Sequence, residues 1–372
     1  MKLAFVTDSF NNETGIGRVI CALAGRFAAR GHDVHVFANS VAILDRAWTS
    51  HTISPRMPLN SLSRWWARYA VPRMIDQMDF DVVNAFTIGR GANVVSAQSC
   101  HAAGLALSES YEKQVKPRKN FGIVDRLTVE DERALFTSPR TKKIIAVSHL
   151  VKNQITKFYV VDPSRICVIP NGVDLNAFSK VRTREKRGDL RAQFGIGQDD
   201  FVILFVGNEF ARKGLHTLVK AIARLPRAPK LVVVGSDNPA PFRSLAQSAG
   251  VGESVLFVGV SRQPEKYFGM ADAFVFPTLY EPFGIVIVEA MAAGLPVITS
   301  KEAGAVEGVV DDNQALLLTD PGSVEEVSAK VNQLIENKEL RLKIATSAIA
   351  YAQKFSWDRV ADETLKEYDE VA

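Results

Sequence analysis

Cysteine is scarce in this chain of 372 residues. The three cysteines, Cys21, Cys100 and Cys167, are odd in number, far apart and embedded in apolar segments. Disulfide frameworks and zinc sites are built from paired or closely spaced cysteines, so the sequence predicts neither. The expected location is a reducing compartment, the cytoplasm.

Long hydrophobic runs are also missing. No uninterrupted apolar stretch approaches the roughly 20 residues that a membrane-spanning helix needs. Residues 1–8 begin directly with a strand-like pattern and lack the apolar core and cleavage site of a signal peptide. We therefore expect no signal peptide and, at most, a peripheral contact with the inner face of the cell membrane.

The chain also lacks a large excess of charge of one sign. Lys and Arg number 45 against 41 Asp and Glu, which gives a formal net charge of +4. This excess is too small to indicate a nucleic acid partner, but it is compatible with an anionic substrate. The charge-rich run 180–189 carries no aromatic residue, and we interpret it as solvated surface at the end of a linker.

What is present is an alternation of short β-branched runs with longer helical stretches. This pattern is typical of parallel sheets built from βαβ units. The length suits two domains, so the predicted fold class is α/β with two doubly wound domains. The expected strands are 3–7, 33–37, 82–85, 94–97, 144–147 and 167–169 in the first half, and 202–206, 230–234, 255–258, 273–276, 296–299 and 315–318 in the second.

The most informative stretch runs from Glu281 to Glu289. After a predicted strand, a Pro-Phe-Gly turn opens a helix whose free N–H groups and positive dipole end suit a diphosphate. Carboxylates repel phosphate, so two acids there favour hydroxyl partners such as a ribose diol and a sugar. The alternative is that Glu281 caps the helix and Glu289 lies on a solvated face.

Two adjacent cations, Arg212 and Lys213, are expected in the loop after strand 202–206, at the ligand edge of the second sheet. A guanidinium fork and a compact ammonium together suit a diphosphate. The alternative is a surface pair.

Gly15 and Gly17 follow the first strand and precede a helix with Val19, Leu23 and Phe27 on one face. Glycines allow backbone N–H groups to approach a phosphate closely. As a dinucleotide fingerprint the string is deficient, because Ile20 occupies the third glycine position. A nicotinamide dehydrogenase is therefore disfavoured, and a plain tight turn remains an alternative.

Three further segments have competing interpretations. His101 is expected at the carboxyl end of strand 94–97, where an imidazole could meet a sugar hydroxyl or be structural. Asp79-Phe80-Asp81 matches a metal-nucleotide string, but it precedes strand 82–85 at the wrong end for a ligand, so a turn or cap is favoured. The basic, aromatic segment Arg64–Arg73, with Trp65 and Trp66, suits a membrane interface, an acceptor groove or a core.

The chain resembles the retaining GT-B glycosyltransferases of family GT4, whose E-x7-E motif matches Glu281 to Glu289. The resemblance runs almost end to end and, within the family, is similar to the bacterial lipopolysaccharide-core glucosyltransferases. The further segments that carry it are 15–18, 144–148, 169–174, 206–215, 233–238 and 355–357.

The resemblance implies a Rossmann-like GT-B architecture with the acceptor on the first domain and the nucleotide sugar on the second. We expect an N-terminal domain at 1–175, a linker at 176–190, a nucleotide-sugar domain at 191–354, and a C-terminal helix at 355–372 that returns to the first domain.

The resemblance also implies residue roles. Arg212 and Lys213 would neutralise the leaving diphosphate without a metal or other cofactor. Glu281 would position the donor sugar, Glu289 would bind the ribose, and His101 would contact the transferred sugar. The remaining donor-binding residues would be Gly15, Gly17, Gly207, Phe283, Gly284 and Ile285.

The implied activity is transfer of a hexose, with UDP-glucose the favoured donor, to a saccharide or lipid-linked acceptor in lipopolysaccharide or surface-polysaccharide synthesis. Two alternatives share the fold or the two-lobed shape: a GT-B sugar-nucleotide epimerase or phosphorylase, and a non-catalytic sugar-binding protein.

Overall fold

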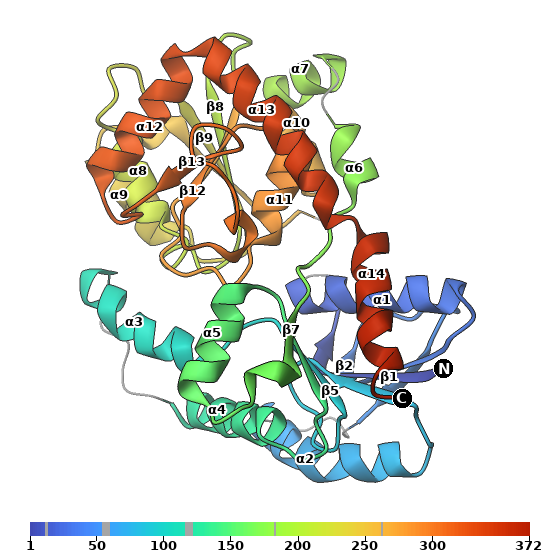
Figure 1. Cartoon of the computed structure of the whole chain (residues 1–372). Coiled ribbons are helices and arrows are strands. Elements are labelled where there is room, and N and C mark those ends of the chain that lie inside the picture. The colour runs from blue at the N-terminus through green and yellow to red at the C-terminus, as the bar shows by residue number, and fades with distance from the viewer. Residues whose placement is uncertain (12–13, 54–59, 116–121, 182–183, 262) are drawn as a thin grey trace. The chain divides into compact units, whose positions relative to one another are not determined.

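The computed structural model describes residues 1–11, 14–53, 60–115, 122–181, 184–261 and 263–372 (Figure 1). The chain forms two compact units. Unit 1 contains Met1–Gly172 together with Trp357–Ala372, and unit 2 contains Val173–Ser356. Each is an α/β unit built on one sheet of parallel strands, as the sequence predicts.

Unit 1 has a seven-stranded sheet in the order β3-β2-β1-β4-β5-β6-β7. Its strands are β1 Lys2–Phe10, β2 Asp33–Val41, β3 Thr49–Thr52, β4 Val82–Ala85, β5 Val94–Ala97, β6 Lys143–Ala146 and β7 Ile166–Val168. The sequence analysis missed β3. This strand lies at the sheet edge, pairs with β2 alone among the described strands, and has the sequence Thr-Ser-His-Thr, which lacks an apolar run.

The helices of unit 1 are α1 Gly15–Ala29, α2 Asn60–Asp76, α3 His101–Val115, α4 Ile123–Phe136, α5 His149–Phe158 and α14 Trp357–Asp369. The Thr14 side chain caps α1 by accepting a hydrogen bond from the Gly17 amide at 3.1 Å. Val19, Leu23 and Phe27 are buried on one face of this helix, which agrees with the predicted apolar stripe.

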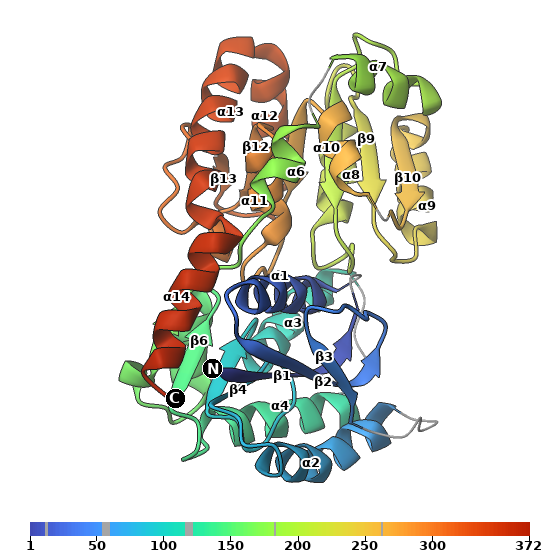
Figure 2. The same cartoon turned by 90° about the vertical axis from the view of Figure 1, so that its right-hand side faces the viewer.

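The C-terminal helix α14 packs against α1 in unit 1 (Figure 2). Arg26 of α1 pairs with Asp358 of α14, and Arg30, the C-cap residue of α1, pairs with Asp362 of α14, each at 2.7 Å. Farther along α14, Tyr368 is fully buried, and its hydroxyl lies 2.6 Å from the Asn84 side chain on β4. The last helix is therefore part of the first unit's core.

Unit 2 has a six-stranded sheet in the order β10-β9-β8-β11-β12-β13. The strands are β8 Val202–Val206, β9 Lys230–Val234, β10 Val255–Gly259, β11 Ala273–Phe276, β12 Val297–Ser300 and β13 Leu316–Leu318. The helices are α6 Leu175–Ser179, α7 Arg184–Gln193, α8 Leu215–Ile222, α9 Ala240–Ser248, α10 Glu265–Met270, α11 Ile285–Ala292, α12 Val324–Glu336 and α13 Lys338–Ala352.

The segment expected as a linker, 176–190, instead contains most of α6 and the start of α7, and both helices belong to unit 2. The physical reason is Arg191, which is 2% exposed. Its guanidinium pairs with Asp272 at 2.7 Å and donates to the Met270 carbonyl at 2.9 Å. A hydrogen-bonded buried ion pair thus anchors α7 where the sequence shows charge without apolar periodicity.

Candidate functional site

The predicted diphosphate loop of unit 2 lies at the carboxyl ends of two neighbouring strands. Gly207 follows β8 and leads to Arg212 and Lys213, while Glu281 follows β11, which is paired with β8. Adjacent parallel strands deliver their following loops to one edge of a sheet. The fold therefore brings together two sequence segments about 70 residues apart.

The ammonium of Lys213 donates a hydrogen bond to Glu281 Oε2. The two side chains are 12% and 9% exposed, and the Lys213 ammonium also lies 5.1 Å from the centre of the Phe276 ring. Burial lowers the pKa of Lys213, and the Glu281 carboxylate opposes that shift. The sequence motif thus forms a shielded cation–carboxylate pair at the strand ends.

Gly214 fixes the chain immediately after this cation. Its φ is 76°, and a Cβ placed there would lie 2.0 Å from the Pro277 carbonyl oxygen. The Leu279 amide also donates to the Arg212 carbonyl at 2.9 Å. The loops after β8 and β11 are therefore in direct backbone contact, and only glycine fits at the crossing.

The Arg212 guanidinium also joins the loops after β8 and β11. It donates to the Tyr280 carbonyl and pairs with Glu209 at 2.5 Å. Glu209 has a φ of 56°, a left-handed conformation uncommon outside glycine. Neither Arg212 nor Lys213 is a solvated surface side chain, because they are 20% and 12% exposed.

The helix expected after the Pro-Phe-Gly turn is α11, and Gly284 is its N-cap with a φ of 98°. A Cβ on Gly284 would lie 3.0 Å from Glu281 Cγ. Ile285 is the first helical residue, and Glu289 is 4% exposed. The alternative in which Glu281 caps the helix and Glu289 is solvated does not hold, because Gly284 is the cap and both acids are buried.

Backbone hydrogen bonds hold the turn from its other side. The Gly304 amide donates to the Glu281 carbonyl at 3.1 Å, and the Ala305 amide donates to the Phe283 carbonyl at 2.8 Å. The Phe283 ring packs 5.8 Å from that of Phe355. Phe283 therefore contributes core packing, and its backbone shapes the turn.

Two loop contacts beside this site escaped the sequence analysis. The Asn208 side-chain oxygen accepts from the Ser236 amide at 2.8 Å, and Asp237 accepts from the Phe210 amide at 2.8 Å. They join the loops after β8 and β9. The sequence signal that could have indicated these contacts is the presence of polar residues directly after two neighbouring strands.

The predicted residues of unit 1 lie on separate elements. Gly15 and Gly17 form the first turn of α1, where a Cβ on Gly17 would meet the Asn11 carbonyl oxygen at 1.7 Å. Gly15 has open space around it. Asp81 accepts from the Lys2 amide at 2.7 Å, and Asp79 has a φ of 50°. The Asp-x-Asp string therefore makes a turn before β4, as expected.

His101 is the first residue of α3, beyond the carboxyl end of β5. Glu132 accepts from its backbone amide at 2.6 Å, and Asp125 Oδ1 lies 3.3 Å from its Nε2. Burial raises the pKa of Glu132, whereas the hydrogen bond from the Tyr159 hydroxyl opposes that shift. The sequence analysis missed Glu132 and Asp125, the two neighbours of His101 named here, because no local motif marks them.

The basic, aromatic segment Arg64–Arg73 lies in α2. Trp66 and Tyr69 are 40% and 52% exposed, whereas Arg68 pairs with Asp131 at 2.8 Å. The side chains of Arg64 and Trp65 lie outside the described residues. Among the helices that the structure describes, none combines the length and apolar character of a membrane span.

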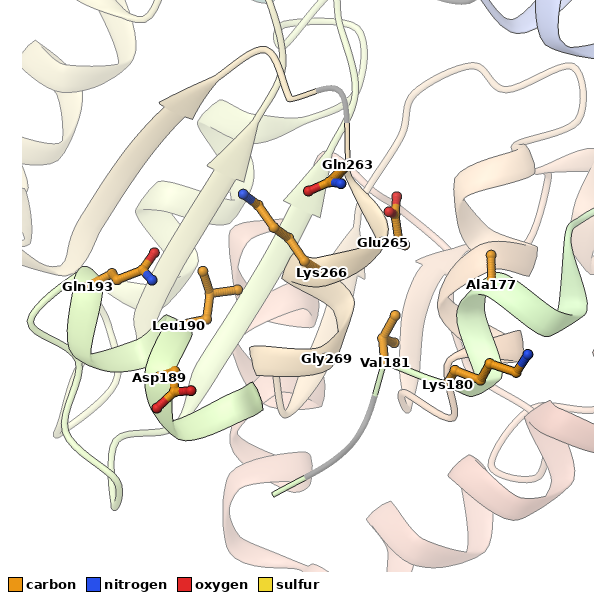
Figure 3. A pocket seen from close by; sticks show the side chains of 10 residues that line it. All are labelled: Ala177, Lys180, Val181, Asp189, Leu190, Gln193, Gln263, Glu265, Lys266 and Gly269. Carbon is orange, nitrogen blue, oxygen red and sulfur yellow. The ribbon is translucent and has the colours of Figure 1, made fainter. Parts of the chain in front are cut away.

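A separate cavity of about 450 Å³ in unit 2 is lined by residues near the end of α6 and from α7 and α10 (Figure 3). Lys180 and Lys266 bring positive charge to it, and Asp189 and Glu265 bring negative charge. None of the predicted site residues lines it. Within the described ranges, no three His, Cys, Asp or Glu side chains gather as a metal-binding group.

Comparison with known families gives two matches. The model described as Glycosyltransferase Family 4 matches residues 14–177, and the model described as Glycosyl transferases group 1 matches residues 186–351.

The chain is similar to the lipopolysaccharide glucosyltransferase WaaG of Escherichia coli K12, with 27% identity over 366 residues that cover 95% of this chain and 94% of WaaG. It is also similar to a D-inositol 3-phosphate glycosyltransferase of Actinosynnema mirum, with 32% identity over 62% of this chain and 57% of the relative.

Among solved structures, a crystal structure of WaaG covers 100% of this chain and 99% of its own, with a TM-score of 0.85 and 25% identity. HepE from Anabaena in complex with UDP and glucose matches over the full length of both chains, with a TM-score of 0.79. At 21% identity, that second likeness shows the fold alone.

Proposed function

Because the chain belongs to the family 4 glycosyltransferases and has their GT-B fold, we propose that it is a retaining, metal-independent hexosyltransferase. The donor is a nucleoside-diphosphate sugar and the acceptor is a saccharide or lipid-linked glycan. The observation that carries this proposal is the Lys213–Glu281 pair beside the N-terminus of α11. A shielded cation and a helix N-terminus are suited to a diphosphate leaving group.

In the proposed mechanism, the donor diphosphate takes the Lys213 ammonium and the Arg212 guanidinium as counter-charges. Negative charge grows on the leaving diphosphate as the sugar–oxygen bond breaks, so fixed cations stabilise the transition state more than the ground state. The first amides of α11, around Gly284 and Ile285, add donors. We propose that these groups do the work for which other transferases use a metal.

The two acids have different proposed partners. Glu281 shares the Lys213 ammonium, so it lies where the sugar joins the diphosphate and positions the sugar hydroxyls. Glu289, buried one turn into α11, accepts hydrogen bonds from the ribose. His101 contacts the transferred sugar, and the leaving phosphate takes the acceptor proton on the same face, which gives retention.

UDP-glucose is the proposed donor. Support comes from the similarity to WaaG, which is named a lipopolysaccharide glucosyltransferase. On the same basis we propose a role in lipopolysaccharide or surface-polysaccharide synthesis at the cytoplasmic face of the membrane. A contact of α2 with that membrane is part of this proposal.

The first test is a thermal-shift panel of the purified protein with UDP, GDP, ADP and NAD, each with EDTA and with added magnesium. We expect one nucleoside diphosphate, UDP, to raise the melting temperature equally in both conditions. The Lys213→Ala variant should lose that shift, whereas Lys220→Ala, an exposed lysine on α8, should keep it. Stabilisation by NAD alone would overturn the transferase proposal, and dependence on magnesium would overturn metal independence.

Product analysis then separates the reaction classes. We expect the matching nucleotide sugar to yield a glycoside whose anomeric configuration equals that of the donor. An epimerised sugar nucleotide, or free sugar phosphate formed only with inorganic phosphate, would instead assign the epimerase or phosphorylase class.

A further inference from the structure

Glu209 lies in the same loop after β8 as the two proposed diphosphate cations. Its Oε2 accepts hydrogen bonds from Arg212 Nε at 3.1 Å and from Arg212 Nη2 at 2.5 Å. The carboxylate therefore lies against the edge of the guanidinium that these two nitrogens form. Arginine uses such a fork of two donors to bind the oxygens of a carboxylate or of a phosphate.

The two partners of this ion pair are held very differently. Arg212 is 20% exposed, and its Nη1 donates a hydrogen bond to the Tyr280 carbonyl, so the loop after β11 anchors the guanidinium. The Glu209 side chain is 66% exposed. A carboxylate that is already largely hydrated loses little when it turns away from its partner. The pair can therefore open by movement of Glu209 while Arg212 stays in place.

Backbone contacts fix the position of Glu209 whichever way its side chain turns. Its φ of 56° is a left-handed conformation that is uncommon for a residue with a side chain. Its carbonyl accepts from the Lys213 amide at 3.1 Å, and the following amide, that of Phe210, donates to Asp237 at 2.8 Å. Backbone strain that persists because its surroundings hold it is concentrated at ligand sites. The loop thus keeps a carboxylate within reach of Arg212.

The charges of the loops bear directly on the binding of an anion. Arg212 is paired with Glu209, and Lys213 is paired with Glu281. A diphosphate would bring more negative charge beside both acids, and like charges repel. Of the two acids, Glu209 is the more exposed, at 66% against 9%, so it withdraws into water at the lower cost.

We propose that Glu209 is a built-in counter-anion, which occupies the Arg212 fork in the ligand-free protein and is displaced by a phosphate of the incoming nucleoside diphosphate. Arg212, still anchored by the Tyr280 carbonyl, then turns no further and offers the same edge to the phosphate. The identity of the ligand rests on the proposed function. The same competition acts on the nucleoside diphosphate that is left after transfer, so Glu209 weakens donor binding and favours product release.

Removal of the Glu209 charge should tighten binding, an effect that damage to the fold would not produce. We expect Glu209→Gln to bind inorganic pyrophosphate and UDP about 5-fold more tightly than the wild type, the upper range for one exposed ion pair. Calorimetric titration at low ionic strength in EDTA gives both affinities. The gain should shrink in about 1 M salt, where the screening length falls to about 3 Å. Equal or weaker binding by the variant at low salt would overturn the proposal.

Two further variants separate the Arg212 fork from other causes. Glu325→Gln is the matched control, because Glu325 is 69% exposed and pairs with Arg224 on another face of unit 2; it should leave both affinities unchanged. In an Arg212→Ala background, Glu209→Gln should give no gain. A gain of the same size in that background would reduce the effect to general charge and overturn the role of the fork.

The remaining outcomes are distinguishable. If Glu209→Gln does not fold, Glu209→Asn replaces it, because asparagine tolerates a left-handed backbone and also lacks the charge. If neither pyrophosphate nor UDP binds to the wild type or to the variant, the proposed diphosphate site fails and this inference fails with it. If both ligands bind equally well to the two proteins, the proposed function stands and only the displacement of Glu209 is overturned.

Discussion

Lys213 and Glu281 form an ion pair across 68 residues of sequence, with both side chains largely shielded from water. The ammonium is thus held beside the helix N-terminus before any donor arrives. A diphosphate that binds there would replace one negative partner by another. Such preorganised charge is the kind that contributes most to catalysis.

Loss of either cation should impair turnover more than folding. We expect Lys213→Ala and Arg212→Ala each to lower kcat by about 10²-fold or more, the loss typical of a preorganised electrostatic contact. Lys220→Ala, on the exposed face of α8, should match the wild type. Initial rates with the donor found in the nucleotide panel provide the measurement. Near-normal turnover by a folded variant would remove that residue from the mechanism.

Two glycines with nearly the same positive φ should respond differently to alanine. Gly214 and Gly250 have φ values of 76° and 77°, but only Gly214 faces a carbonyl oxygen, that of Pro277, at 2.0 Å from the added Cβ. Gly250→Ala should lower the free energy of unfolding by about 1–2 kcal/mol through the left-handed backbone. Gly214→Ala should cost more and weaken nucleotide binding. Urea unfolding and nucleotide titration would check this, and equal costs would contradict it.

Glu132 should make stability depend on pH in a defined direction. Burial raises the pKa of its carboxyl in the folded protein, so above about pH 4.3, the ordinary glutamate value, the folded state binds more protons than the unfolded state. The stability contribution therefore falls as pH rises through the range from the ordinary to the raised pKa. Glutamine does not titrate.

We expect the free energy of unfolding of the wild type, minus that of Glu132→Gln, to decrease as pH is raised from about 4 towards neutrality. Urea unfolding of both proteins at a series of pH values gives this difference. A difference that stays constant or grows with pH would show that the carboxyl is not destabilised in its charged form.

The C-terminal helix should contribute strongly to unit 1. Tyr368→Ala removes a fully buried ring and should lower the free energy of unfolding by about 3–5 kcal/mol. Tyr368→Phe removes only the hydroxyl contact with Asn84 and should cost about 1 kcal/mol. Tyr69→Ala, at a half-exposed tyrosine of α2, is the control and should have little effect. A small loss for Tyr368→Ala would mean that α14 is peripheral.

The sequence predicted the two sheets well because buried parallel strands are continuous apolar runs, such as β8 and β11. It missed β3, whose four polar residues belong to a sheet edge. It also assigned 176–190 to a linker, because the apolar signal of α7 is replaced by the hydrogen bonds of Arg191. Local pattern alone cannot show an ion pair whose partner, Asp272, is 81 residues away.

For the site, motif residues such as Glu281, Lys213 and Gly284 were found because their spacing around a turn carries chemical meaning. Their supporting groups were not found. Glu132 reads as one acid among several on an amphipathic helix, and its partner is a backbone amide of another helix. Because almost every residue has a backbone amide, the sequence cannot show which amide a side chain contacts, and such contacts are found only in the structure.

The order of synthesis follows from the placement of α14. Unit 2 is one continuous segment, Val173–Ser356, whereas unit 1 is completed by Trp357–Ala372. On the ribosome, which releases chains from the N-terminus, the unit that begins first is therefore finished last. Until Tyr368 emerges, Asn84 lacks the hydroxyl that it contacts in the folded core. A nascent chain stalled within α14 would thus carry a complete second unit and an unfinished first one.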